Sequence, residues 1–269
     1  ATDFVKDNHL SLIDANDGSY RIVVEDDASG SRTRRLLADI AKSGAITLIS
    51  HPTNQGYTRS VNAGIRDGTA PFVITLNSDT VVPRGWHRRL LEPFQRFERL
   101  GIAGPLSSAG SWQSVPFRFS QNGGWLANSL PFGHDVESVQ HWLGSTWEPA
   151  YPEIPLLNGF CLCTRREVFD QIGLFDEAAF PVGYGEENDL CLRAAKEGWQ
   201  LRVVDDLYIF HAKSKSFGKH RGHLSKAGTG SLKEKHPDVD WAELDALLRH
   251  HQGLRAVRTH FGELIGAIE

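Results

Sequence analysis

One stretch, residues 71–80, constrains the fold of this chain more than any other: it reads Pro-Phe-Val-Ile-Thr-Leu-Asn-Ser-Asp-Thr. Residues 72–76 form a short, nearly all-apolar run rich in β-branched side chains, which is typical of a strand buried on both faces. Polar oxygen atoms appear abruptly after it, at Asn77 and Asp79. Because these residues are two positions apart in an extended chain, their side chains point the same way and can share one ligand.

Asn77 and Asp79 combine an amide oxygen with a carboxylate, which is the ligand chemistry of Mg²⁺ or Mn²⁺ bridging phosphates. In open α/β sheets, ligands bind at the carboxyl ends of the strands, where these two residues lie. The competing interpretation is an ordinary turn, since Asn, Ser and Asp commonly follow strands. Taken alone these residues favour the turn, so the choice depends on the rest of the chain.

Strands and helices alternate along the sequence. Apolar runs predict further strands at residues 20–24, 46–50, 102–106, 156–165 and 201–210. Amphipathic patterns predict helices between them, at residues 33–42, 57–66 and 84–100. This alternation predicts an α/β fold of the Rossmann-like kind, with a mainly parallel sheet flanked by helices. The pattern becomes purely helical from residue 236, so we expect one domain over residues 1–235 and a helical C-terminal extension over residues 236–269.

The composition argues against several classes of protein. The net charge is −4 over 269 residues, which gives no general attraction to nucleic acid. No apolar run is long enough to span a bilayer, so a membrane role would be peripheral. Cys161, Cys163 and Cys191 are too few for a disulfide framework and lack zinc-knuckle spacing, which predicts buried structural thiols in a reducing compartment.

Acidic residues gather at two further places. Asp26 and Asp27 follow the strand at 20–24, and Glu186, Glu187 and Asp189 open a helix behind a Gly-Tyr-Gly sequence. Each group has an ordinary explanation, because carboxylates cap helices and are stabilised by the dipole of a first helical turn. Three carboxylates in four residues exceed what a helix start needs. Together with Asn77 and Asp79, they predict an anionic pocket at one edge of the sheet.

Two other features point to the same edge. His211 ends the strand at 201–210 and precedes a basic run over residues 213–221. A histidine in that place is a candidate ligand, and the basic run is either solvated or closes over phosphates. Residues 107–156 lack periodicity and carry four tryptophans, which suit either stacking on sugar rings or packing of this segment on the core.

In combination these motifs resemble those of glycosyltransferase family 2, whose members have the GT-A fold. The likeness extends to bacterial transferases that build O-antigens and related surface polysaccharides, including rhamnosyltransferase-like members. The matching motifs follow the family's order and are Val-Val-Glu-Asp-Asp at 23–27, Asn-Gln-Gly-Tyr-Thr-Arg at 54–59, Leu-Asn-Ser-Asp at 76–79, Gly-Leu-Phe-Asp-Glu at 173–177, Gly-Glu-Glu-Asn-Asp at 185–189, and His211 with Ser-Phe at 216–217.

The resemblance implies a nucleotide-diphospho-sugar donor, a divalent cation (Mg²⁺ or Mn²⁺) and inversion at the anomeric carbon. The residues that it places at the donor nucleotide are Asp26, Asp27 and Arg59, with Asn77 and Asp79 at the diphosphate. The residues that it implies as metal ligands are Asp79, His211 and Asn77. The residues that it implies for catalysis are Glu187 as the base, with Glu186 and Asp189 beside it.

The chain departs from the family's pattern in three ways. Asn77 replaces a carboxylate, and Glu187 is one methylene longer than the usual aspartate, so Glu186 and Glu187 both stay candidates for the base. The family's first strand, which ends in Pro-Val-Tyr-Asn, is not found ahead of residue 20. We expect a segment outside this sequence, or one of a neighbouring chain, rather than residues 1–13, to fill the place beside the strand at 20–24.

The expected function is transfer of a sugar to a hydroxyl of a glycan or lipid-linked glycan in surface polysaccharide synthesis. The expected location is the cytoplasm or the inner face of the membrane, within a chain that can include further domains. One alternative is a catalytically inactive GT-A domain that binds glycans or nucleotides. Another is a sugar nucleotidyltransferase, although its Gly-rich phosphate loop is not visible. The nucleotide, sugar, acceptor, linkage and oligomeric state do not follow from the sequence.

Overall fold

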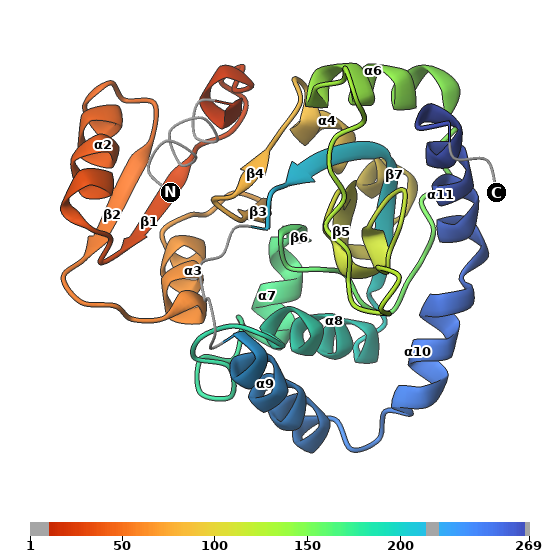
Figure 1. Ribbon diagram of the computed structural model, residues 1–269. Helices are drawn as coiled ribbons and strands as arrows, with labels where there is room; N and C mark the ends of the chain where they lie inside the picture. Colours follow the sequence, from red (N-terminus) through yellow and green to blue (C-terminus); the bar gives the residue numbers. More distant parts are fainter. Residues whose placement is uncertain (1–10, 214–220, 267–269) are drawn as a thin grey trace.

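A five-stranded mixed sheet forms the centre of the molecule, and a separate pair of strands lies beside it (Figure 1). The computed structural model describes residues 11–213 and 221–266. The central sheet has the order β3-β6-β5-β7-β4. Its strands are β3 (Phe72–Leu76), β6 (Cys161–Arg165), β5 (Leu100–Ser107), β7 (Gln200–His211) and β4 (Thr80–Val81).

The separate pair consists of β1 (Val23–Asp27) and β2 (Thr47–His51), which run parallel with Val23 opposite Thr47. Helix α2 (Ser31–Lys42) packs on β2, and helix α3 (Tyr57–Arg66) packs on β1 and leads into the central sheet. The β1-α2-β2-α3 order is the predicted βαβ alternation, and this part of the expectation is confirmed.

The α/β class is confirmed, but the central sheet is mixed rather than mainly parallel. Only β5 and β7 run parallel in it, whereas β6 is antiparallel to both β3 and β5, and β4 is antiparallel to β7. The reason lies in the long segment after β5. It returns the chain to the sheet at the end where β5 finished, so β6 runs back beside it instead of crossing over.

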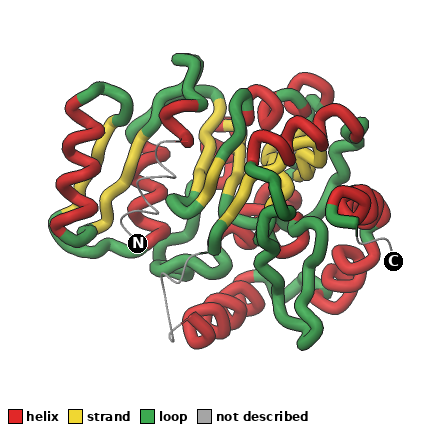
Figure 2. The backbone as a smooth tube through the Cα atoms, turned by 45° about the horizontal axis from the view of Figure 1, so that its top comes forward, coloured by secondary structure: helices red, strands yellow, loops and turns green. Residues whose placement is uncertain are grey.

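Helices cover both faces of this sheet (Figure 2). They are α4 (Trp86–Leu91), α5 (Pro93–Arg96), α6 (Val136–Thr146), α7 (Arg166–Ile172) and α8 (Glu186–Lys196), with a 3₁₀ turn, η1, at Ser111–Gln113. The single helix predicted at residues 84–100 is divided into α4 and α5 at Pro93, which has no N–H to donate and clashes with the preceding turn.

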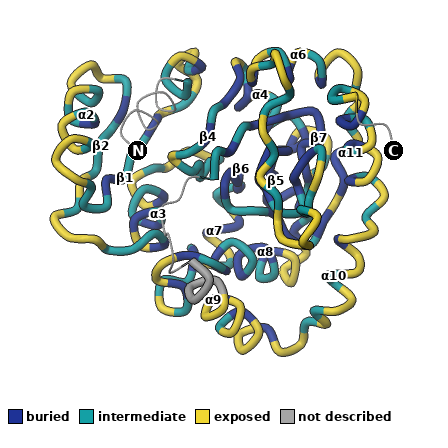
Figure 3. The backbone as a smooth tube through the Cα atoms, in the orientation of Figure 1, coloured by how far each residue is buried: buried dark blue, intermediate teal, exposed yellow. Residues whose placement is uncertain are grey.

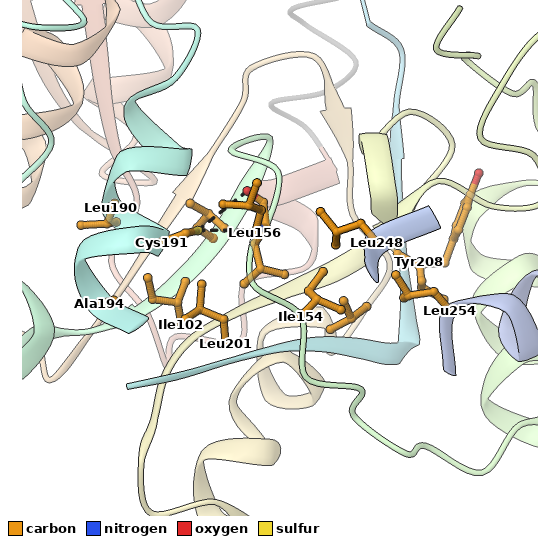
Figure 4. Packing of buried hydrophobic residues seen from close by; sticks show 14 of the residues in the cluster. Ile102, Ile154, Leu156, Leu190, Cys191, Ala194, Leu201, Tyr208, Leu248 and Leu254 are labelled. Atoms are coloured by element: carbon orange, nitrogen blue, oxygen red, sulfur yellow. Dashed lines mark hydrogen bonds between the residues drawn. The ribbon is translucent and has the colours of Figure 1, made fainter. Parts of the chain in front are cut away.

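The C-terminal segment is helical, as predicted, and consists of α9 (Arg221–Lys235), α10 (Trp241–His250) and α11 (Gln252–Leu264). Leu248, Leu254, Val257 and Phe261 of these helices are almost fully buried in the cluster that contains β5 and β7 residues (Figures 3 and 4). The extension therefore packs on the body of the molecule. The boundary between residues 235 and 236 stays a prediction, and α9 was not foreseen.

The inner edge of β1 faces the inner edge of β3 across a cavity. Among the described residues, β1 pairs only with β2 and β3 only with β6. Both strands line the cavity, including Val23, Val24, Val73 and Ile74. Residues 11–14 are helical, and residues 1–10 lie outside the described part of the chain. The expectation that a further segment fills this place stays a prediction.

Candidate active site

The cavity, of about 2010 Å³, continues from the strand edges to the carboxyl ends of β1 and β3. Its wall there is completed by the first turns of α3 and α8 and by Thr229 of α9. The predicted site residues found in this wall are Asp27, Asn77, Asp79, Glu186, Glu187 and His211. These groups come from four separate segments, the ends of β1, β3 and β7 and the start of α8, which meet at one edge as is general for ligand sites of α/β sheets.

Asp79 and His211 meet in this wall. Asp79 directly precedes β4, His211 ends β7, and the antiparallel pairing of these strands sets Thr80 opposite His211. As a result, Oδ1 of Asp79 lies 3.1 Å from Nε2 of His211. The two side chains are 16% and 9% exposed, so they are partly shielded from water but still reachable from the cavity.

The surroundings of His211 fix the orientation of its ring. Nδ1 lies 2.9 Å from the carbonyl oxygen of Ala109, which can only accept, so Nδ1 carries a proton. The ring also stacks on Phe160, with 5.3 Å between the centroids. In the neutral ring, Nε2 then turns a lone pair toward the Asp79 carboxylate. Two acceptors that face each other suit a shared cation, and a carbonyl behind the ring is typical of a ligating histidine.

Asn77 lies next to this pair in the cavity wall. Its backbone N–H donates to the carbonyl oxygen of Phe160, and its own carbonyl oxygen accepts from the Thr80 hydroxyl, both at 2.8 Å. Among the residues that the structure describes, no three His, Cys, Asp or Glu side chains gather closely enough to hold a metal by themselves. A carboxylate, an imidazole and an amide oxygen nevertheless fit Mn²⁺ or Mg²⁺ that takes its remaining ligands from phosphate and water.

Glu186 and Glu187 converge at the start of α8. The N–H of Gly185 donates to Oε2 of both, at 3.0 and 3.2 Å. Burial raises the pKa of Glu187, and burial together with the neighbouring carboxylate raises the pKa of Glu186 well above its ordinary value. Gly185 has a φ of 139°, which favours glycine and turns both side chains toward the cavity. Two carboxyl groups with raised pKa values in a cleft are suited to proton transfer.

Asp189, the third predicted catalytic carboxylate, does not line the cavity. It is fully buried, with Oδ2 2.8 Å from Nε of Arg193 and Oδ1 2.8 Å from Nε2 of His236. Lys235 reaches the same Oδ1 at 3.0 Å. These partners come from α8 and from the end of α9, so Asp189 anchors α9 on α8. We therefore assign Asp189 an anchoring role, and its predicted catalytic role stays a prediction.

The two aspartates at the end of β1 point to opposite sides, because successive side chains of a strand alternate. Asp27 lines the cavity and accepts the backbone N–H groups of Gln55 and Gly56, at 2.6 and 3.0 Å. Asp26 is 1% exposed and instead accepts the N–H of Ser29, with Arg34 at 3.7 Å. Asp27 thus holds the loop before α3 beside the cavity, whereas Asp26 stabilises the turn before α2.

Arg59 is placed on a different face of α3 from the cavity. Its Nε lies 3.4 Å from Oε2 of Glu177, and Oε1 of the same carboxylate accepts from Asn62 at 2.8 Å and from Arg66 at 3.0 Å. The family-like Asp176-Glu177 pair is likewise structural, because Asp176 accepts from Lys235 of α9 at 2.6 Å. These contacts tie α3, α9 and the loop before α8 together.

Tyr57 is a cavity residue that the sequence analysis overlooked. It opens α3 directly after Gly56, lines the cavity and packs beside Gly183. Burial raises the pKa of its phenol, and the charges of Glu186, Glu187 and Asp79 add to the increase. The phenol is thus neutral and lies in the field of both acidic groups. Its position in the Asn-Gln-Gly-Tyr motif was the available signal.

The segment Asn158-Gly159 supports Glu187. The side-chain amide of Asn158 donates to the Ser111 hydroxyl at 2.9 Å, and its N–H donates to Oε1 of Gln113 at 2.7 Å. The next residue, Gly159, lies so close to Glu187 that a Cβ atom there would be 3.1 Å from the Glu187 Cβ. The loop after β5 is therefore bonded to the segment that packs on the glutamate.

The remaining predictions concern cysteines, membranes and the basic run. Cys161, Cys163 and Cys191 are free and buried, and burial raises the pKa of the Cys191 thiol to about 12. Within the described part of the chain, no helix is long and apolar enough to cross a membrane. Of the basic run at 213–221, Lys213 lines the cavity, and residues 214–220 lie outside the described residues.

Comparisons with known proteins connect this geometry to a chemistry. A family model described as glycosyl transferase family 2 matches residues 2–173. The chain is 29% identical over 271 residues to the N-acetylglucosaminyl-diphospho-decaprenol L-rhamnosyltransferase of Mycobacterium tuberculosis, covering 93% of this chain and 85% of that protein.

Solved structures show the same fold at lower identity. The mannosyltransferase PcManGT from Pyrobaculum calidifontis, solved in complex with GDP-Man and Mn²⁺, superposes with a TM-score of 0.63 at 15% identity, covering 100% of this chain and 73% of that one. GalNAc-T7, solved with UDP, GalNAc and Mn²⁺, gives a TM-score of 0.60 at 14% identity, covering 99% and 53%.

Proposed function

The chain belongs to glycosyl transferase family 2 and has the GT-A fold, and from this premise we propose that it transfers a deoxyhexose such as rhamnose from a nucleoside-diphosphate donor to a lipid-linked glycan, with inversion. One observation carries the proposal. A single cavity is lined by the adjacent side chains of Asp79 and His211, whose chemistry suits a cation, and by a separate pair of carboxyl groups with raised pKa values, Glu186 and Glu187. Inverting transfer needs these two functions on opposite sides of the reacting carbon.

Asp79 and His211, with Asn77 beside them, would hold a divalent cation at the donor diphosphate. Both structural relatives described above were solved with Mn²⁺ and a nucleotide or nucleotide sugar. When bound, the cation supplies positive charge for the diphosphate that leaves. The protein's own part is to orient His211 through the Ala109 carbonyl and to keep the Asp79 carboxylate facing the cavity.

Glu187 is the proposed base. It accepts the proton of the acceptor hydroxyl while that oxygen attacks the anomeric carbon and the bond from this carbon to the diphosphate oxygen breaks. The electron pair of the broken bond leaves on the diphosphate. Glu186 is the more buried of the two, and burial together with the charge of Glu187 raises its pKa well above the ordinary value, so Glu186 is the one of the pair that keeps a proton. Asp27 is placed to bind the nucleotide from the β1 side of the cavity.

The acceptor class rests on the mycobacterial relative, whose name specifies N-acetylglucosaminyl-diphospho-decaprenol. An acceptor of this kind presents a sugar hydroxyl at a membrane surface. We therefore place the protein at the cytoplasmic face of the membrane, acting in the synthesis of surface polysaccharide. The rival proposal is an inactive domain that binds glycans or nucleotides. Asn77 supports it, because an amide in place of a carboxylate leaves less negative charge to hold a cation.

The test has two stages. Thermal shift with UDP-, GDP- and dTDP-sugars, with and without Mn²⁺, identifies the donor, since a ligand at 100 times its Kd stabilises the fold by about 2.7 kcal/mol. Transfer from that donor to N-acetylglucosaminyl-diphospho-prenol is then followed by mass spectrometry. A glycosylated lipid product is the expected result. Donor binding without transfer or hydrolysis would favour the inactive domain, and pyrophosphate release from a nucleoside triphosphate would identify a nucleotidyltransferase.

A further inference from the structure

The aromatic side chains of the loop after β5 form a cluster of Trp112, Phe119 and Trp125. The rings of Trp112 and Trp125 meet edge to face with 4.8 Å between centroids, and Phe119 lies 4.8 Å from Trp125 at a tilt of 34°. Edge-to-face and offset contacts of this kind are the preferred geometries of aromatic pairs. The cluster therefore has a fixed shape.

Trp125 differs from the other two members of the cluster. Trp112 packs against the main hydrophobic core, whereas the Trp125 side chain is 43% exposed. Both tryptophans line the cavity of the candidate active site. Packing of the loop on the core thus accounts for Trp112 but leaves the open face of Trp125 unexplained.

The backbone around Trp125 is held in place. Ser120 donates its N–H to the Gly124 carbonyl oxygen, and Leu126 donates to the Arg118 carbonyl oxygen, both at 2.8 Å. These bonds form a short hairpin in which Phe119 bridges to Trp125. The guanidinium groups of Arg118 and Arg249 lie 5.3 and 5.1 Å from the Phe119 ring centroid and cover that side of the cluster. Trp125 is thus a rigid ring, as binding at low entropic cost requires.

The position of the cluster relative to the catalytic groups defines what it can bind. Ser111, next to Trp112, is bonded to Asn158, and Gly159 packs on Glu187. The nucleotide side of the cavity is formed by β1 and α3, which lie across the molecule from the loop after β5 (Figure 1). The cluster is therefore connected to the side of the proposed base, where the acceptor hydroxyl must enter.

From this arrangement we propose that Trp125 is the platform on which a sugar ring of the acceptor stacks. The inference rests on the proposed function and assigns the acceptor subsite within it. The C–H groups of one pyranose face are apolar and match an exposed indole, whereas the ring's hydroxyls stay free to reach Glu187. The occupant is thus the acceptor sugar rather than the donor nucleotide or the lipid chain.

The experiment compares Trp125→Ala and Trp125→Phe with Phe132→Ala. Phe132 is fully exposed in the same loop region and does not line the cavity, so its variant controls for loss of a surface aromatic. We expect Trp125→Ala to raise the KM for N-acetylglucosaminyl-diphospho-prenol about tenfold, Trp125→Phe to lie between it and the wild type, and Phe132→Ala to match the wild type. Donor Kd, measured without acceptor, stays unchanged in all three.

Three results with folded variants would overturn the inference. An acceptor KM in Trp125→Ala equal to that of Phe132→Ala shows that the ring does not bind the acceptor. A parallel loss of donor affinity moves the platform to the donor side. If Trp125→Ala no longer unfolds cooperatively, the test rests on Trp125→Phe instead. An acceptor KM of Trp125→Phe equal to that of the wild type would contradict stacking on the indole. If the increase in acceptor KM caused by Trp125→Ala becomes larger with longer prenyl chains on the same sugar, Trp125 contacts the lipid chain rather than the sugar. If the wild-type protein binds no nucleotide sugar, the proposed function fails first, in a separate measurement.

Discussion

Gly228 of α9 lies against the backbone of Tyr184, so close that a Cβ atom at residue 228 would overlap the Tyr184 carbonyl oxygen. On the other side of the same loop, a Cβ atom on Gly56 would overlap the carbonyl oxygen of Pro181. The loop that delivers Glu186 and Glu187 is thus held between the start of α3 and the middle of α9. Two glycines make this close approach possible.

Gly228→Ala should therefore displace the glutamates. Because backbone atoms cannot move aside as a flexible side chain does, we expect a loss of about 1–3 kcal/mol in the free energy of unfolding. We also expect a fall in kcat of at least about tenfold, since small misplacements of catalytic groups cost this much or more. Gly230→Ala in the same helix is the control, because no atom lies within 4 Å of its added Cβ. Equal kcat values for the two variants would show that the contact does not position the site.

The Asp79–His211 pair predicts how the donor is held. Asp79→Asn and His211→Ala should each weaken Mn²⁺-dependent binding of the nucleoside diphosphate by about tenfold or more, as removal of a metal ligand or its orienting partner typically does. Isothermal titration with and without Mn²⁺ measures the effect. His250→Ala, at an exposed histidine of α10, is the control. Unchanged Mn²⁺ dependence in both site variants would remove these residues from the cation site.

Glu187 and Glu186 are distinguished by single substitutions. Glu187→Gln keeps the size of the side chain but cannot take a proton, so transfer should fall by about 10²–10⁴-fold while donor affinity stays nearly constant. Glu186→Gln should retain measurable transfer. The rates are compared in single-turnover assays with saturating acceptor. If only Glu186→Gln is inactive, the base is Glu186.

Much of this site could be predicted from the sequence because strand ends converge. Asn77, Asp79 and His211 each follow an apolar run, and such runs end at a common edge once they pair. The direction of the pairing could not be predicted in the same way. Whether β6 is parallel or antiparallel to β5 depends on the end of the sheet to which the long loop between them returns. The sequence of this loop has no periodicity from which that end could be predicted.

Asp26 and Asp189 do not line the cavity, and the sequence did not indicate this for a different reason. Adjacent side chains of a strand point to opposite faces, so only one of Asp26 and Asp27 can face the cavity, and the motif alone does not say which. The burial of Asp189 was not evident because its partners Lys235 and His236 lie at the end of α9 and just after it, and α9 was not predicted. Gly228 and Gly230 lower the helix propensity of that segment, and its packing against the loop before α8 compensates.

The pKa of Glu186 leads to a prediction of stability against pH. A carboxyl group whose pKa is raised on folding stabilises the fold below its ordinary pKa of 4.5, and this contribution is lost as the pH rises through the folded-state value. Above pH 4.5 the unfolded chain releases this proton while the folded protein retains it, so the free energy of unfolding falls as the pH rises. Glu186→Gln should be more stable than the wild type at pH 8, and the difference should disappear toward pH 4. Urea denaturation at both pH values measures it, with the exposed Glu98→Gln as control. A pH-independent difference would contradict the buried, protonated state.

Asp189 supports a final prediction, which separates anchoring from catalysis. Its carboxylate is fully buried between Arg193 of its own helix and His236 beyond α9, so Asp189→Asn leaves a partly buried guanidinium without its counter-charge. Breaking one side of a buried pair costs about 3–5 kcal/mol. Asp245→Asn removes an exposed partner of Arg249 and should cost no more than about 1 kcal/mol.

Chemical denaturation compares the two variants, and transfer is assayed at a temperature where both are folded. We expect Asp189→Asn to retain transfer within about tenfold of the wild type, because its effect passes through the placement of α9. A variant that is fully stable yet inactive would return Asp189 to the catalytic set.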